Sequence, residues 1–137
     1  MLNCVITETK SIEPVVYDWG AVKWVANNEL APGCEQSFGL VHITPGKTNS
    51  EHWHTAAEEI VYMLQGECTV RVGDKRLTIV PGQTLIIPQG VKHEVSNEGW
   101  EPVVYVCSFS ASVRGTLFED PSGPGARPLS GRSSQPW

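Results

Sequence analysis

The sequence predicts an all-β fold, an antiparallel barrel or sandwich, and three observations support that prediction. The 137 residues include 13 glycines and 10 prolines, more than average usage, and so many turn formers leave little room for long helices. Short segments rich in β-branched and aromatic residues lie between the turns. No segment of ten or more residues carries a helical period of apolar side chains. A chain of this length and pattern is expected to form one domain of short strands.

Ten segments fit short strands. In chain order they are Val15–Asp18, Ala21–Ala26, Gln36–Thr44, Ser50–His54, Glu59–Leu64, Cys68–Val72, Lys75–Val80, Thr84–Ile87, Lys92–Ser96 and Val103–Phe109. The segment Cys68–Val72 shows the typical alternation, because Thr69 and Arg71 separate its apolar residues and would lie on the opposite face. Gly73-Asp74 then predicts a tight hairpin turn into Lys75–Val80.

Charge, cysteine spacing and hydropathy exclude several classes of protein. The formal net charge is −5 with only 10 lysines and arginines, so we expect no basic face for nucleic acid. The four cysteines form no CxxC pair, which argues against a disulfide framework or a structural zinc site. The first residues do not show the charged and apolar regions of a signal peptide, and no apolar run approaches the ~18 residues of a membrane span. We therefore expect a cytoplasmic protein with reduced thiols and no membrane partner.

Three of the four histidines fall into two short constellations that suit a metal. His52 and His54 are two residues apart, so on a strand both imidazoles leave the same face and can bind one ion. Glu59 opens the next predicted strand, and His93 lies on a later one. Three imidazole nitrogens and one carboxylate oxygen suit Mn, Fe, Co, Ni, Cu or Zn and leave coordination positions open for substrate or water.

The two stretches around these residues resemble the two motifs of the cupin superfamily. Residues 46–66 match G(X)5HXH(X)3,4E(X)6G, and residues 82–97 match G(X)5PXG(X)2H(X)3N, at every defined position. The match selects Glu59 over its neighbour Glu58, because only Glu59 is followed by six residues and then Gly66.

The resemblance implies a small, bowl-shaped antiparallel β-barrel of the double-stranded β-helix, or jelly-roll-like, kind with a metal inside. The implied ligands are His52, His54, Glu59 and His93, and the implied cofactor is one divalent transition metal: Fe, Mn, Ni, Cu or Zn. The alternative is a cupin fold that has lost its metal. Such sites usually have a substituted ligand, whereas this set is complete.

Period-2 alternation predicts the wall of the substrate pocket. The predicted pocket residues are Val61, Met63, Val95, Tyr105, Cys107, Phe109 and His42. His42 also fits the more ordinary role of a surface or core histidine. Trp53, between two ligands, should face away from the metal. No cluster of arginine or lysine is evident among the wall residues, and Cys107 fits a buried structural thiol better than a nucleophile. Glu59 and Tyr105 are the candidate catalytic residues.

The predicted function is a metal-dependent enzyme acting on a small, oxygen-rich molecule that chelates the ion, such as an enol, a catechol or a keto acid. Oxygenation, and hence an oxidoreductase of the dioxygenase kind, is favoured slightly because an apolar wall suits such substrates and excludes bulk water. The first alternative is a non-redox decarboxylase, isomerase, cyclase or lyase. The second is a non-catalytic cupin that binds a small ligand.

The domain prediction places a single domain at residues 1–118 and a Pro/Gly/Ser-rich tail at residues 119–137. The tail is expected to be flexible, or else to form an arm that lies on a partner subunit through Trp137. A homodimer is expected through the segment Val15–Ala26, where Trp19 and Trp24 offer an aromatic surface. The same two side chains could instead close the barrel.

Overall fold

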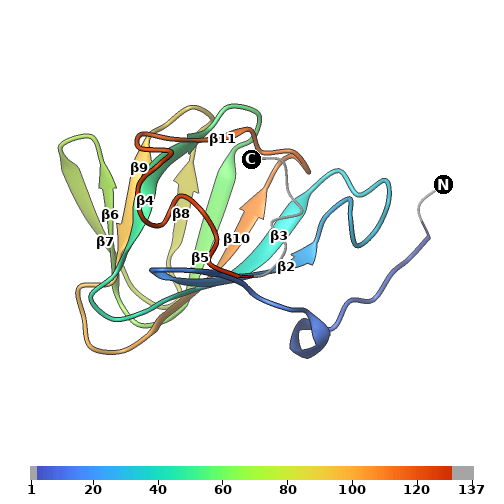
Figure 1. Ribbon diagram of the computed structural model, residues 1–137, viewed down its shortest axis with the longest axis horizontal. Helices are drawn as coiled ribbons and strands as arrows, with labels where there is room; N and C mark the ends of the chain where they lie inside the picture. Colours follow the sequence, from blue (N-terminus) through green and yellow to red (C-terminus); the bar gives the residue numbers. More distant parts are fainter. Residues whose placement is uncertain (1–2, 131–137) are drawn as a thin grey trace.

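The computed structural model describes residues 3–130, which form eleven strands and one turn of 3-10 helix at Thr9–Ser11 (Figure 1). The strands are β1 (Val15–Tyr17), β2 (Gly20–Ala26), β3 (Ser37–Ile43), β4 (Thr48–His54), β5 (Glu59–Gln65), β6 (Cys68–Val72), β7 (Lys75–Ile79), β8 (Thr84–Ile87), β9 (His93–Ser96), β10 (Val103–Phe109) and β11 (Thr116–Phe118). No helix among residues 3–130 has the length and apolar character needed to cross a membrane. The predicted all-β class is therefore confirmed.

Two antiparallel sheets pack face to face, and the core lies between them (Figure 1). The six-stranded sheet has the order β1-β2-β3-β10-β5-β8, and the five-stranded sheet has the order β11-β4-β9-β6-β7. On β10 every second side chain is buried, from Val103 to Phe109, as expected for a strand with one face on a core. Neighbours in sequence often lie in different sheets, so each sheet combines strands from both halves of the chain.

The strand predictions match the structure except near the C-terminal end. All ten predicted segments overlap strands, with ends shifted by a few residues; β4, for example, begins at Thr48 instead of Ser50. Strand β11 was not predicted. It pairs with β4 so that Thr116 lies opposite His54 and Phe118 opposite His52. Its three residues form a strand because β4 offers a free edge, which no local pattern reveals.

Residues 119–130 pack on the barrel, so the prediction of a flexible tail outside the domain is wrong for this stretch. The indole Nε1 of Trp19 donates to the carbonyl of Gly125 at 3.0 Å, and Ser50 Oγ donates to the carbonyl of Pro124 at 2.8 Å. Ala126 is buried, and Ser130 forms a bridge to Val16 on β1. The proposed contact through Trp137 lies outside the described residues.

Trp19 and Trp24 do not form an exposed aromatic surface, which corrects the predicted dimer contact. Trp19 is buried and stacks on Tyr17 with ring centroids 4.7 Å apart. Trp24 is half-buried, and its ring lies 6.0 Å from that of Phe109 on β10. The two indoles therefore close the barrel, as the alternative interpretation held.

Gly125→Ala tests the packing of residues 119–130. Gly125 has φ +89°, and an added Cβ would lie 2.7 Å from Ser50 Oγ and 2.9 Å from Trp19 Cδ1. We expect a loss of roughly 2–4 kcal/mol in the free energy of unfolding, from backbone strain and from overpacking together, measured by chemical denaturation. Gly82→Ala is the matched control, since Gly82 has φ +87° with no atom within 4 Å of the added Cβ. Equal losses in the two variants would mean that the segment does not pack here in solution.

Candidate metal centre and substrate cavity

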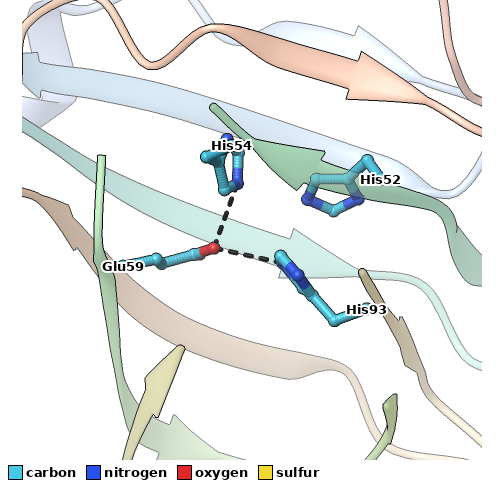
Figure 2. A group of neighbouring side chains, drawn as sticks. All are labelled: His52, His54, Glu59 and His93. Carbon is cyan, nitrogen blue, oxygen red and sulfur yellow. Dashed lines mark ion pairs between the residues drawn. The ribbon is translucent and has the colours of Figure 1, made fainter. Parts of the chain in front are cut away.

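Four side chains from three strands converge inside the barrel (Figure 2). His52 and His54 leave the same face of β4, and Trp53 between them is half-buried on the other face. Glu59 is the first residue of β5, and His93 is the first residue of β9, directly opposite His52 in the strand register. The two-residue spacing thus places both β4 imidazoles toward the carboxylate, as Figure 2 shows.

The geometry of these four side chains suits one ion. Glu59 Oε2 lies 3.2 Å from Nε2 of His54 and 3.2 Å from Nε2 of His93. One ligand atom from each of the four residues lies within 4.8 Å of the others. All four residues are buried, so the group is shielded from bulk water.

The opposite ring nitrogen of each histidine has a partner that orients the ring. Nδ1 of His52 lies 2.6 Å from the carbonyl of Ser50, and Nδ1 of His93 lies 2.9 Å from the carbonyl of Val91. A carbonyl only accepts, so in both rings Nδ1 carries the proton and Nε2 keeps its lone pair when the imidazole is neutral. Nδ1 of His54 lies 2.9 Å from Thr116 Oγ1 on β11. This is the arrangement in which metal-ligating histidines are commonly held.

Two atoms at the centre are buried without a hydrogen bond: Nε2 of His54 and Oε2 of Glu59. Their 3.2 Å contact lacks hydrogen-bond geometry. Burying a polar atom without a partner costs about 1–3 kcal/mol, and more when the group is charged. A divalent ion would accept the lone pairs of both atoms, so the residues present fit a metal.

The electrostatics of Glu59, His52 and His93 bear on that assignment. Burial raises the pKa of Glu59, but contacts with His54 and His93 outweigh burial and hold that pKa below its usual range. Burial, together with His93 and His54, lowers the pKa of His52 to about 3, so this imidazole is neutral at pH 7. Burial lowers the pKa of His93, and Glu59 raises it by more. The Glu59 carboxylate is thus ionised and would be the one negatively charged ligand of a bound ion.

The four residues form part of the wall of a cavity of about 70 Å³. That volume holds roughly five to seven water-sized groups and is well below the several hundred Å³ of a drug-sized pocket. Four of the predicted pocket residues line it: Val95, Tyr105, Cys107 and Phe109. Burial raises the pKa of Tyr105 well above its usual value, and burial likewise raises that of Cys107, so both groups stay protonated.

Three predicted pocket residues lie elsewhere. His42 is exposed on β3 between the buried Val41 and Ile43, so alternation turns its side chain away from the cavity. Val61 and Met63 are buried in the apolar core but do not reach the cavity wall. They share the inward face of β5 with Glu59, as predicted, but lie farther along the strand.

The cavity also contains a cation that the sequence did not indicate. Arg114, between β10 and β11, is 2% exposed and lines the cavity. Its Cζ lies 3.9 Å from the ring centroid of Trp24 and 5.1 Å from that of Phe109. Its Nη1 is buried and has no hydrogen-bond partner. A single arginine in a polar stretch of sequence carries no local signal of burial, so only the fold could place it here.

Backbone contacts hold Arg114 in place. Its carbonyl accepts from the amide of Ala56 at 3.0 Å, and the next carbonyl, that of Gly115, accepts from the amide of Thr55 at 3.0 Å. Gly115 has φ +64°, and a Cβ there would lie 2.2 Å from Thr55 Oγ1. Only glycine allows this close approach to the loop that joins the metal-binding residues of β4 and β5.

Comparisons with known proteins agree with this fold and site. The family profile of the Cupin domain matches residues 39–109. The rhicadhesin receptor of Pisum sativum is 31% identical over 107 residues, which cover 72% of this chain and 49% of that protein. Germin-like protein subfamily 2 member 2 of Arabidopsis thaliana is 32% identical over 99 residues, which cover 66% of this chain and 45% of that protein.

A solved structure gives the same picture of the fold. The crystal structure of the oxalate decarboxylase of Lactobacillus farciminis, in a formate complex, superposes with a TM-score of 0.73 over 80% of this chain and 34% of that one. The sequence identity is 24%, so this likeness shows the fold alone. The matched part is about half the length of the Pisum sativum and Arabidopsis thaliana relatives.

Thr116→Val tests whether β11 supports the metal site. The substitution removes the hydroxyl that contacts His54 Nδ1, and we expect metal affinity to fall roughly 10–100-fold, measured by titrating metal-free protein with Mn(II). Thr78→Val, at an exposed position on β7, is the control and should bind metal as the wild type does. Unchanged affinity in Thr116→Val would show that this contact does not orient the ligand.

Proposed function

The chain belongs to the cupin family, and from that premise we propose that it is a divalent-metal-dependent enzyme acting on a small, oxygen-rich organic molecule that itself binds the metal. The proposal includes one transition metal ion held by His52, His54, Glu59 and His93. Their donor set leaves coordination positions open, which is typical of catalytic as opposed to structural metal sites.

One observation carries the proposal. Nε2 of His54 and Oε2 of Glu59 face each other in a buried, water-shielded place without hydrogen bonds, beside a cavity large enough for a small molecule. A site built only for stability would satisfy these atoms within the protein. An unsatisfied pair next to a cavity supports a role in binding an ion and a substrate together.

The residues of the chain have distinct proposed tasks. When bound, the ion can polarise an oxygen of the substrate or support chemistry with dioxygen. Glu59 supplies the single negative charge among the ligands, and its lowered pKa favours the ligand role over that of an acid. Tyr105 stays a neutral phenol in the cavity wall and can donate a hydrogen bond to a substrate oxygen. The apolar wall formed with Val95 and Phe109 excludes water.

We propose oxygenation of an enol or keto acid as the reaction, because the apolar wall keeps bulk water from the reacting centre. The cavity of about 70 Å³ favours such short molecules over a catechol. A non-redox reaction, decarboxylation among others, is the second candidate; it is the reaction type of the oxalate decarboxylase that shares this fold. The third candidate is a non-catalytic cupin that binds a small ligand.

We further propose that the chain is a homodimer joined through the outer face of the six-stranded sheet. Ile60, Tyr62 and Leu64 of β5 are exposed on that face, with Ile86 of β8 directly beside Ile60. Contiguous exposed apolar side chains on a sheet are typical of an interaction surface, and a second copy would cover them. This face replaces the N-terminal strands as the expected contact.

His52→Ala tests the proposed function. The variant loses one of four ligands, so we expect metal content to fall from about one ion per chain to a small fraction of that, and turnover to be abolished. The measurements are elemental analysis of untagged protein and oxygen uptake by protein loaded with Fe(II), Mn(II), Ni(II) or Cu(II) against a panel of enols and keto acids.

His42→Ala is the matched control, since His42 is an exposed histidine remote from the cavity and should keep full metal content and turnover. Absence of oxygen uptake with every metal and substrate would exclude oxygenation and favour the non-redox reaction. Ligand binding that survives His52→Ala undiminished would instead identify a binding protein that does not use a metal.

Tyr62→Glu tests the proposed dimer. A charge in the middle of the apolar face should convert a dimer of about twice the 15.0 kDa chain mass into a monomer, as measured by size-exclusion chromatography with light scattering. Leu77→Glu, at an exposed position on β7 of the other sheet, should leave the dimer intact. A monomeric wild type would contradict the proposal.

A further inference from the structure

We propose that Arg114 is a carboxylate-recognition residue, so that the substrate is a small organic anion with a carboxylate on Arg114 and a second oxygen toward the metal site. This inference rests on the proposed function for the metal, but its central observation is independent of the metal. The guanidinium is 2% exposed, lines the cavity and has an Nη1 without a hydrogen-bond partner.

The two aromatic contacts of Arg114 do not supply a hydrogen-bond acceptor for its Nη1. Arg114 Cζ lies over the Trp24 ring, 3.9 Å from its centroid, and an aromatic face offers no oxygen or nitrogen acceptor to the N–H donors of the guanidinium. Phe109 contributes a second, longer contact of 5.1 Å. The two rings therefore hold the guanidinium in place and leave the edge that carries Nη1 for a ligand. A planar carboxylate matches such an edge with two parallel hydrogen bonds.

The position of Arg114 relative to the metal-binding residues suits a short bridging molecule. Phe109 contacts both Arg114 and one of the candidate ligands. Its ring centroid lies 4.8 Å from that of His54 and 5.1 Å from Arg114 Cζ. Arg114 and all four candidate ligands line the same cavity of about 70 Å³. A molecule of few atoms can thus lie within reach of the guanidinium and of the ion together.

The charge of the cavity also favours an anion. Glu59 is the only carboxylate among the described residues that line it. A divalent ion on three neutral imidazoles and Glu59 retains one positive charge, and Arg114 adds a second. Two buried positive charges without a counter-charge are costly, and a bound carboxylate would reduce that cost. Among the candidate substrates, a keto acid meets this requirement and a neutral enol does not.

The experiment compares a carboxylate with its neutral amide on the Mn(II)-loaded protein by isothermal titration calorimetry. The probes are pyruvate and pyruvamide, with glyoxylate and oxalate as further carboxylates. In the wild type we expect pyruvate to bind roughly 10–100-fold more tightly than pyruvamide, as a charged hydrogen-bonded pair predicts. In Arg114→Met that preference should disappear while metal content, from elemental analysis, stays at the wild-type level.

Two further variants keep the test decisive. Arg114→Lys keeps the charge but not the planar edge, so it should bind pyruvate more weakly than the wild type yet retain part of the preference over pyruvamide. If Arg114→Met does not fold, Arg114→Lys and the wild-type comparison of pyruvate with pyruvamide still test the role of Arg114. Arg76→Met removes an exposed arginine on β7 that pairs with Glu98, and it should bind all probes as the wild type does.

The outcomes separate this inference from the proposed function. Equal wild-type affinity for pyruvate and pyruvamide, no binding of any carboxylate, or wild-type pyruvate binding by Arg114→Met would overturn the role of Arg114 even when the metal is bound. A wild type that holds no metal would contradict the proposed function instead. The same titrations on metal-free protein would then decide the role of Arg114, since dependence of pyruvate binding on Arg114 supports it and independence overturns it.

Discussion

The contacts of their Nδ1 atoms fix the orientation of three imidazole rings in this barrel, and the chemistry of the site follows from that constraint. Carbonyls hold Nδ1 of His52 and His93, and the Thr116 hydroxyl holds that of His54. The Nε2 atoms consequently face Glu59, whose carboxylate oxygen is buried without a hydrogen bond. The sheets, the turns and the cavity wall hold these nitrogen and oxygen atoms close together and shield them from bulk water.

The carbonyl contacts are local, whereas the support of His54 comes from far along the chain. Ser50 and Val91 each lie two residues before the histidine that they orient, so the strands themselves set those two rings. Thr116 lies 62 residues after His54 and reaches it only because β11 pairs with β4. The same pairing leads Arg114 into the cavity, where its carbonyl is bonded to the loop between the ligands. The candidate metal site and the cavity beside it are thereby joined by hydrogen bonds from β11 and from the segment before it.

This difference between local and distant contacts explains which features could be predicted from the sequence. The spacing of His52 and His54, and the six residues between Glu59 and Gly66, identify three of the four candidate ligands locally, and alternation correctly placed Tyr105, Cys107 and Phe109 on the inward face. Alternation could not show how far along the inward face of β5 the cavity extends. It therefore could not predict that Val61 and Met63 lie in the apolar core and not in the cavity wall. The three-residue strand β11 has no periodicity to detect. Arg114 and the packing of residues 119–130 depend on pairings between distant parts of the chain, so neither has a local signal.

The order of these parts along the chain has a consequence for biosynthesis. All four candidate metal ligands precede Asn97, whereas Arg114, Thr116 and Gly125 follow it. At a synthesis rate of about 5–20 residues per second, the ribosome delivers the ligands roughly seconds before the strand that orients His54 and the segment that closes over Trp19. During that interval the imidazoles and the carboxylate meet whatever ions the surroundings supply. An ion that binds the four residues in that interval would do so before Thr116 orients His54, so the ions available during synthesis, and not the completed cavity alone, would influence which metal occupies the site.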